Sequence, residues 1–148
     1  MTLTAQDPCF EARVRASFER QAVMHGLGIQ LTAIQAGQVE LIMPYNPQWT
    51  QQHGYIHAGI MATALDSACG YAAFSLMPAD AEVLSIEFKI NLMAPARGDT
   101  FRFLGRVIKA GRTISVCEGQ AWSLSPQEKL VCTMTATMMT LREQPTSG

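Results

Sequence analysis

Charge is scarce in this sequence. Only 16% of the 148 residues are charged, against 48% that are hydrophobic, and the net charge is −1. A chain so close to neutral has no overall attraction for nucleic acid or acidic membranes, so we expect neither as a partner, and any basic site must be local. The length fits a single domain, residues 1–148, with a sizeable hydrophobic core.

The four cysteines lack the spacing and density of a structural set. Cys9, Cys69, Cys117 and Cys132 form no CxxC pair and are too few for a small disulfide-rich scaffold. We interpret all four as buried thiols in a reducing compartment, which predicts a cytoplasmic protein. The first residues do not show a basic stretch followed by an apolar run, which is the pattern of a secretory signal, so we expect none there. Neither His residues nor other candidate ligands have metal-site spacing, so no metal is expected.

The first 25 residues predict a short helix that docks onto the rest of the domain. Asp7 is expected to cap it and Pro8 to be its first residue. Phe10, Val14 and Phe18 recur every four residues and so share one face. We expect this helix to end near residues 25–26.

The centre of the chain predicts one long buried helix, residues 57–76. Alanines recur there every four residues after Ile60, and small side chains predominate, so another element must pack closely against it. The apolar run is long enough to suggest a membrane span, but Asp66, His57, Pro78 and several hydroxyl residues argue against one.

Alternating patterns predict six strands around this helix. The order is a helix, two strands, the long helix, then four strands joined by short turns, with no helix between successive strands. It favours an α+β fold in which a curved antiparallel sheet wraps around one central helix. Residues 143–148 are expected to form a flexible tail. The expected strands are residues 28–36, 38–44, 83–92, 100–109, 113–123 and 130–141.

Asp66 is the one formal charge between Glu40 and Asp80. It falls inside the apolar helix, where a carboxylate is costly unless it is paired or used. It is therefore either a catalytic base or nucleophile, or a structural residue that faces solvent or bonds a nearby hydroxyl. The start of the same helix offers the unpaired N–H groups of Ala58 and Gly59, which suit an oxyanion.

Two motifs together carry a family resemblance: "QQHGYIHAG" and, shortly after it, "ATALDSACG". They resemble the PaaI-like branch of the hot-dog-fold acyl-CoA thioesterases, whose pattern is Asn-x-x-Gly-x-x-His-Gly-Gly with an acidic residue nine positions after the His. Gln51 stands for the usual Asn and Ala58 for the first Gly of the pair. The resemblance continues through "SIEFKINLMAPARGDT" and "KAGRT" and covers roughly residues 25–140.

The resemblance implies hydrolysis of a medium-chain, long-chain or aromatic acyl-CoA to the free acid and CoA. It implies that Asp66 either activates water as a general base or attacks the thioester itself as a nucleophile. The N–H group of Ala58, with Gly59 beside it, would bind the oxyanion. Gln51 would bind the thioester or orient the carboxylate, and Ser85 would position the water, with an ordinary strand serine as the alternative for Ser85.

A local excess of basic residues lies between Phe88 and Arg112, where six Lys and Arg face one acid, Asp99. It could receive the phosphates of CoA, which is here part of the substrate rather than a cofactor. Period-two alternation would place Ser85, Glu87, Lys89 and Asn91 on one face of their strand. The resemblance implies that the CoA contacts are Asn91, Arg97, Lys109, Gly111, Arg112 and Thr113.

Hot-dog thioesterases usually dimerise by pairing their sheets, so the resemblance implies a homodimer or a dimer of dimers. Each site would combine Asp66 of one chain with the oxyanion junction of the other. Two other functions stay open: a non-catalytic acyl-CoA sensor, and a hot-dog hydratase or dehydratase. A hydratase or dehydratase normally pairs a His with an Asp or Glu on the helix. The separation of His57 from Asp66 disfavours this function. We expect His57 to support its loop instead.

Overall fold

Six strands form one antiparallel sheet in the computed structural model, which describes residues 2–142. The strand order is β1-β2-β4-β5-β6-β3, so β1 and β3 are the two edges. The elements are α1 (Phe10–Glu19), α2 (Ala22–Gly26), β1 (Gln30–Gln35), β2 (Gln38–Pro44), η1 (Pro47–Trp49), α3 (Ala58–Phe74), β3 (Ala81–Leu92), β4 (Thr100–Ala110), β5 (Ile114–Ser123) and β6 (Lys129–Arg142).

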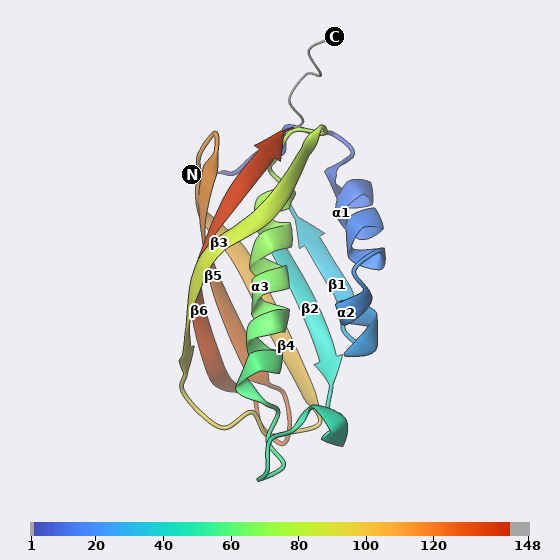
Figure 1. Cartoon of the computed structure of the whole chain (residues 1–148), viewed down its shortest axis with the longest axis vertical. Coiled ribbons are helices and arrows are strands. Elements are labelled where there is room, and N and C mark those ends of the chain that lie inside the picture. Colours follow the sequence, from blue (N-terminus) through green and yellow to red (C-terminus); the bar gives the residue numbers. More distant parts are fainter. Residues whose placement is uncertain (1, 143–148) are drawn as a thin grey trace.

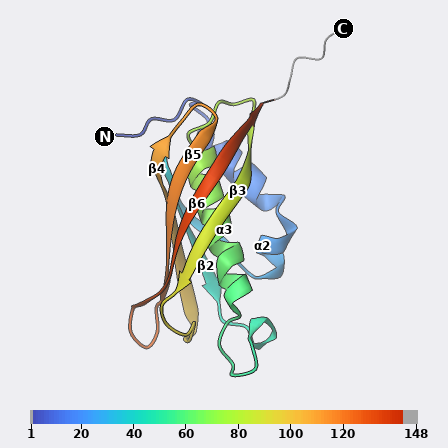
Figure 2. The same ribbon diagram turned by 60° about the vertical axis from the view of Figure 1, so that its left-hand side comes forward.

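The three α-helices lie on the same side of the sheet (Figures 1 and 2). The sheet curves around α3, and α1 and α2 lie beside it near β1. This confirms the predicted α+β hot-dog architecture, and the long helix and six strands lie within a few residues of their expected ranges. No helix of residues 2–142 is both long and apolar enough to cross a membrane. The expected tail at 143–148 lies outside the described residues.

Glycines in the sheet allow α3 to pack unusually close to it. A Cβ atom added to Gly105 of β4 would lie 2.3 Å from the backbone C and O atoms of Ala68. Gly119 of β5 pairs directly with Gly105, and its added Cβ would lie 3.1 Å from Cys69 Sγ. The close packing predicted from the small residues of the helix is therefore confirmed. It buries one side of α3 against β4 and β5 and turns Asp66 away from them.

The N-terminal helix differs from its prediction in two ways. It begins at Phe10 rather than at Pro8, because the carboxylate of Asp7 accepts a hydrogen bond from Cys9 N–H (2.8 Å) and closes a turn before the helix. It also breaks in two, since Gln21 adopts an extended conformation (φ −85°, ψ 94°) between α1 and α2. Val14 and Phe18 are buried as expected, and Phe10 is half-buried.

Arg13 ties α1 to the far end of α3. Its guanidinium group donates to the carbonyl oxygens of Phe74 (3.0 Å) and Met77 (2.8 Å), and also to that of Pro78. The same group pairs with Asp7 (3.1 Å) and lies over the Phe74 ring, 4.4 Å from its centroid. Carbonyl groups at a helix C-terminus lack intrahelical donors, so this arginine satisfies them from another segment of the chain.

A β-bulge in β3 overturns the expected period-two face. Ser85 pairs with Met138, but Glu87 pairs with Thr137, which leaves Ile86 as an extra residue. Directly paired residues point to the same side of a sheet, so Ser85 shares the inner side with buried Met138. The other three residues that were expected beside Ser85 point to the outer side: Glu87, Lys89 and Asn91.

We predict that Gly105→Ala destabilises the fold by about 1–3 kcal/mol, because the new methyl group must push the backbone of α3 away from β4. Urea unfolding measures the change. The matched control is Gly70→Ala on α3, where an added Cβ meets nothing within 4 Å. That variant should be unchanged or about 0.5–1 kcal/mol more stable, as alanine favours helix. Equal stability of the two variants would contradict the close contact.

Candidate active site

Asp66 lies in the middle of α3 on the side that faces β3. Ser85 Oγ donates a hydrogen bond to its Oδ1 atom (2.6 Å) and also lies 3.4 Å from Met138 Sδ. The bulge at Ile86 makes this contact possible, because it turns Ser85 toward the helix. Asp66 is half-buried, and its Oδ2 atom accepts no hydrogen bond from residues 2–142. The carboxylate is thus held by one oxygen and available through the other.

A cavity of about 250 Å³ opens beside Asp66 and Ser85. Two of its walls come from α3 and the start of β3, and the third comes from α1 and the junction between α1 and α2. That third wall was not expected, because the sequence suggested only a docking role for this segment and no motif marks it. The lining residues are Ser17, Gln21, Asp66, Ser67, Gly70, Tyr71, Glu82, Val83, Leu84 and Ser85.

Helix α3 begins with a cap made by His57. The N–H group of Gly59 donates to His57 Nδ1 (2.9 Å), and those of Ile60 and Met61 reach the His57 carbonyl oxygen (2.9 and 3.3 Å). The N–H group of Ala58 has no acceptor within residues 2–142. Of the two amides expected to bind an oxyanion, Gly59 is therefore occupied and Ala58 is available, at the positive end of the helix dipole.

Gln51 lies beside Ala58, and its two amide atoms have different surroundings. Its Oε1 atom accepts hydrogen bonds from His53 N–H (2.6 Å) and Tyr55 N–H (3.2 Å), which fixes the loop before α3. Its Nε2 atom has no acceptor in the described part of the chain. Gln51 and Ala58 line a second cavity of about 370 Å³, together with Tyr55, Ile56, Met61, Leu92, Met93, Ala94, Pro95, Ala96 and Cys132.

These two clusters are separate within one copy of the chain. Asp66 follows Ala58 by eight residues on the same helix, a rise of about 12 Å. They line different cavities, and no residue is common to both. One chain therefore presents a carboxylate with its hydroxyl partner at one place, and an unpaired backbone donor with an amide at another.

The expected CoA-binding residues are spread over the molecule. Arg97 precedes β4 and Arg112 follows it, so the two lie at opposite ends of that strand. Asn91 lies on the outer side of the sheet, where its Nδ2 atom donates to Thr133 Oγ1 (3.3 Å). Lys109, near the end of β4, and Thr113, in the β4–β5 turn, are exposed.

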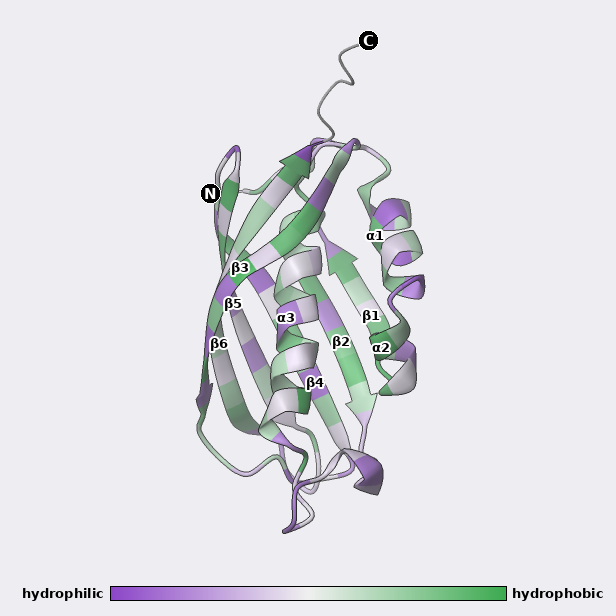
Figure 3. Ribbon diagram, viewed as in Figure 1, coloured by the Kyte–Doolittle hydropathy of each residue, from purple (hydrophilic) through white to green (hydrophobic). Residues whose placement is uncertain are grey.

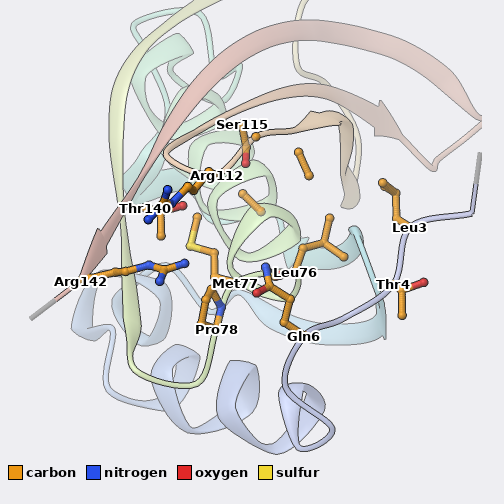
Figure 4. A pocket seen from close by; sticks show the side chains of 13 residues that line it. Leu3, Thr4, Gln6, Leu76, Met77, Pro78, Arg112, Ser115, Thr140 and Arg142 are labelled. Carbon is orange, nitrogen blue, oxygen red and sulfur yellow. Dashed lines mark hydrogen bonds between the residues drawn. The ribbon is translucent and has the colours of Figure 1, made fainter.

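Gly111 and Arg112 line a cavity of about 420 Å³ beyond the C-terminal end of α3. Figure 4 shows Arg112 beside Thr140, and Arg142 extending toward Met77. No carboxylate is among the residues that line this cavity in the described chain. Two guanidinium groups at a cavity that is lined by no acidic residue of the described chain are suited to a phosphate-bearing ligand.

Three of the four cysteines are buried, free thiols, as expected, but Cys9 is exposed just before α1. Burial raises the pKa of Cys117 to about 12 and that of Cys132 to about 11, and it raises the pKa of Cys69 as well. These three side chains remain protonated near neutral pH and are poor nucleophiles. Within residues 2–142, no cluster of three or more His, Cys, Asp and Glu could hold a metal ion.

Comparison with known proteins agrees with this geometry. The model of the thioesterase superfamily matches residues 53–129, a segment that contains both Ala58 and Asp66. The chain belongs to the thioesterase superfamily. With its fold, this makes it a hot-dog thioesterase, and so a hydrolase.

Individual relatives support the family. A thioesterase family protein from Silicibacter pomeroyi is 50% identical, with a TM-score of 0.89 over 90% of this chain and 99% of that one. A protein of Halobacterium salinarum named "Putative esterase" is 30% identical over 112 residues, 72% of this chain and 74% of its own. The PaaI protein of E. coli, from the phenylacetic acid degradation operon, is 20% identical with a TM-score of 0.82 over 89% and 93% of the two chains, which shows a shared fold.

We predict that His57→Ala lowers the free energy of unfolding by about 1 kcal/mol, the usual worth of an N-cap. His57→Asn keeps an acceptor for the Gly59 N–H group and should recover most of the loss. Thermal unfolding measures both, with exposed His53 changed to Ala as the control. A His57→Ala protein of unchanged stability that has lost its hydrolytic activity would show that His57 transfers protons instead.

Proposed function

We propose that this thioesterase hydrolyses acyl-CoA esters, with Asp66 as the general base. The observation that carries the proposal is the hydrogen bond from Ser85 to Asp66 Oδ1, at the edge of a cavity, while Oδ2 accepts no hydrogen bond from the described part of the chain. Ser85 fixes the orientation of the carboxylate, and Oδ2 can accept a proton from water. A half-buried carboxylate in this arrangement suits general-base catalysis.

The proposed reaction needs two groups besides the base. As water attacks the thioester carbonyl carbon, its proton passes to Asp66, and negative charge develops on the carbonyl oxygen. The free N–H group of Ala58 is a suitable donor to that oxygen, and Gln51 Nε2 is a second donor in the same cavity. When the C–S bond breaks, the CoA sulfur takes the proton back from Asp66. The products are the free acid and the CoA thiol, and Asp66 is again a carboxylate.

The exposed edge of β3 supports a homodimer. As the last strand of the sheet, β3 leaves the backbone groups on one of its sides unpaired, and such edges invite pairing with another strand. Large apolar residues accompany this edge, with exposed fractions of 42–61%. Figure 3 shows hydrophobic residues along β3. These exposed residues are Leu84, Ile86, Phe88 and Leu92, followed by Met93.

Antiparallel pairing of two β3 strands about a twofold axis would unite the two clusters. Ser85, near the start of β3, faces Asp66, whereas Leu92, at its end, lines the cavity of Ala58. Reversing one strand against the other brings the start of β3 in one copy beside its end in the second copy. The carboxylate of one copy would then approach the oxyanion donor of the other.

The same symmetry suggests how the CoA handle binds. It would bring the Arg97 end of one copy toward the Arg112 end of the other, although these residues are far apart within one chain. The cavity of Arg112 and Arg142 then offers a place for phosphates. We propose that the CoA nucleotide binds there. CoA is then a part of the substrate rather than a cofactor.

We predict that Asp66→Asn lowers kcat by about 10²- to 10⁴-fold, because the amide cannot accept the proton from water. Release of the CoA thiol from a panel of acyl-CoA esters measures turnover, and ligand-dependent thermal stabilisation measures binding. Binding and unfolding temperature should remain close to those of the wild type. Near-native turnover in Asp66→Asn would refute the mechanism, and a wild type that binds these esters without hydrolysing any would indicate a sensor.

The shared site predicts that two inactive variants restore each other. Ala58→Pro removes the N–H group at a helix position where proline is well tolerated. A mixed dimer of Ala58→Pro and Asp66→Asn chains contains one intact site and one doubly altered site. Refolding the two together should therefore recover about a quarter of wild-type activity, for random pairing into twofold dimers. The double variant Ala58→Pro/Asp66→Asn, refolded with wild type, is the control. Recovery no greater than the sum of the two variants would place each site within one chain.

A further inference from the structure

We infer that Gln21 is a specificity-determining residue, whose side-chain amide N–H group binds an oxygen atom of the acyl group in the cavity beside Asp66. This rests on the proposed acyl-CoA hydrolysis and names its substrate class: short, uncharged acyl groups that carry a hydroxyl or keto oxygen. The residue belongs to the junction between α1 and α2, outside both motifs of the site.

The position of Gln21 is fixed by α3. Ser67 Oγ donates to Gln21 Oε1 (2.9 Å), and Ser67 is the residue that follows Asp66 on the helix. This bond occupies the acceptor atom of the amide. Gln21 Nε2 is left without an acceptor among residues 2–142, at a side chain that lines the cavity. A hydrogen-bond donor therefore remains for a ligand close to the catalytic carboxylate.

The cavity is polar beyond Asp66 itself. Seven of its ten lining residues have polar side chains, and one turn further along α3 Tyr71 Oη lies 3.2 Å from Ser17 Oγ. Burial raises the pKa of Tyr71, so its hydroxyl remains protonated and uncharged. A purely aliphatic chain would leave Gln21 Nε2 without an acceptor from residues 2–142 or from the ligand, which costs binding free energy. An acyl group with its own oxygen would accept a hydrogen bond from this amide.

The size and charge of the cavity further narrow the class of acyl groups that it accepts. At about 250 Å³ the cavity is smaller than typical pockets for drug-sized ligands, roughly 300–1,000 Å³, so a short acyl group fits it. Its charged lining residues, Asp66 and Glu82, are both acidic, and no Lys or Arg of residues 2–142 lines it. A carboxylate carried by the acyl group would therefore be repelled by Asp66 and Glu82. An added Cβ at Gly70, one turn from Asp66, meets nothing within 4 Å, which shows where the space lies.

The test compares two esters of equal chain length, 3-hydroxybutyryl-CoA and butyryl-CoA. Gln21→Glu keeps the acceptor for Ser67 but replaces the amide donor, and Gln21→Met removes both without adding charge. We expect each variant to lower kcat/KM about tenfold for the hydroxy ester, the worth of one hydrogen bond, and less than about twofold for butyryl-CoA. The matched control is Gln35→Glu, which adds the same charge on β1 at the opposite edge of the sheet.

The outcomes separate this inference from the function on which it rests. Equal losses on both esters would show that Gln21 acts on the pantetheine arm or on the fold, and would overturn the inference while leaving the hydrolase intact. Unchanged selectivity, or a wild type that prefers butyryl-CoA, would overturn it as well. A wild type that hydrolyses no acyl-CoA ester refutes the proposed function itself. An unfolding temperature of Gln21→Glu within about 1 °C of wild type, below the shift of roughly 2–4 °C that 1 kcal/mol causes in a domain of this size, would show that selectivity changed without loss of the fold.

Discussion

The close contact between α3 and the glycines of β4 and β5 determines the geometry of the whole domain. Without side chains at Gly105 and Gly119, the helix can press its small residues onto the centre of the sheet. The depth and rotation of α3 are then fixed, because protein interiors are packed at the density of organic crystals. Since the alanine side of the helix faces β4 and β5, Asp66 has to face the edge of the sheet. A contact on the other side of the same helix thus decides where the carboxylate lies.

The edge strand completes this arrangement with a local irregularity. A regular β3 would have turned Ser85 and Glu87 to the same side, and the extra residue Ile86 instead separates them. Ser85 reaches the carboxylate and the charged residues that follow it remain outside. Bulges often re-aim one side chain in this way near functional sites. The hydroxyl that holds Asp66 is therefore a product of strand irregularity as much as of sequence identity.

Much of the architecture could be predicted from periodicity, because helix and strand repeats are local properties. The long helix, the strand boundaries and the isolated charge of Asp66 are all visible in single segments. The bulge was not, since it depends on how β3 aligns with a strand more than forty residues away, as the Ser85–Met138 pair shows. The break at Gln21 was missed for the same reason, as its side chain is held by Ser67 from another helix. The capping of Gly59 by His57 required side-chain geometry that a motif does not specify.

Arg13 gives the first 26 residues an importance beyond covering the core. By holding the end of α3, it sets the position of α1, and with it the wall that carries Ser17 and Gln21. The proposed base, Asp66, and the oxyanion donor, Ala58, both lie on α3, whereas this wall comes from a segment anchored at the C-terminal end of that helix. Substitutions in this N-terminal segment can therefore change which substrates the enzyme accepts during evolution, while the reaction centre is left unaltered.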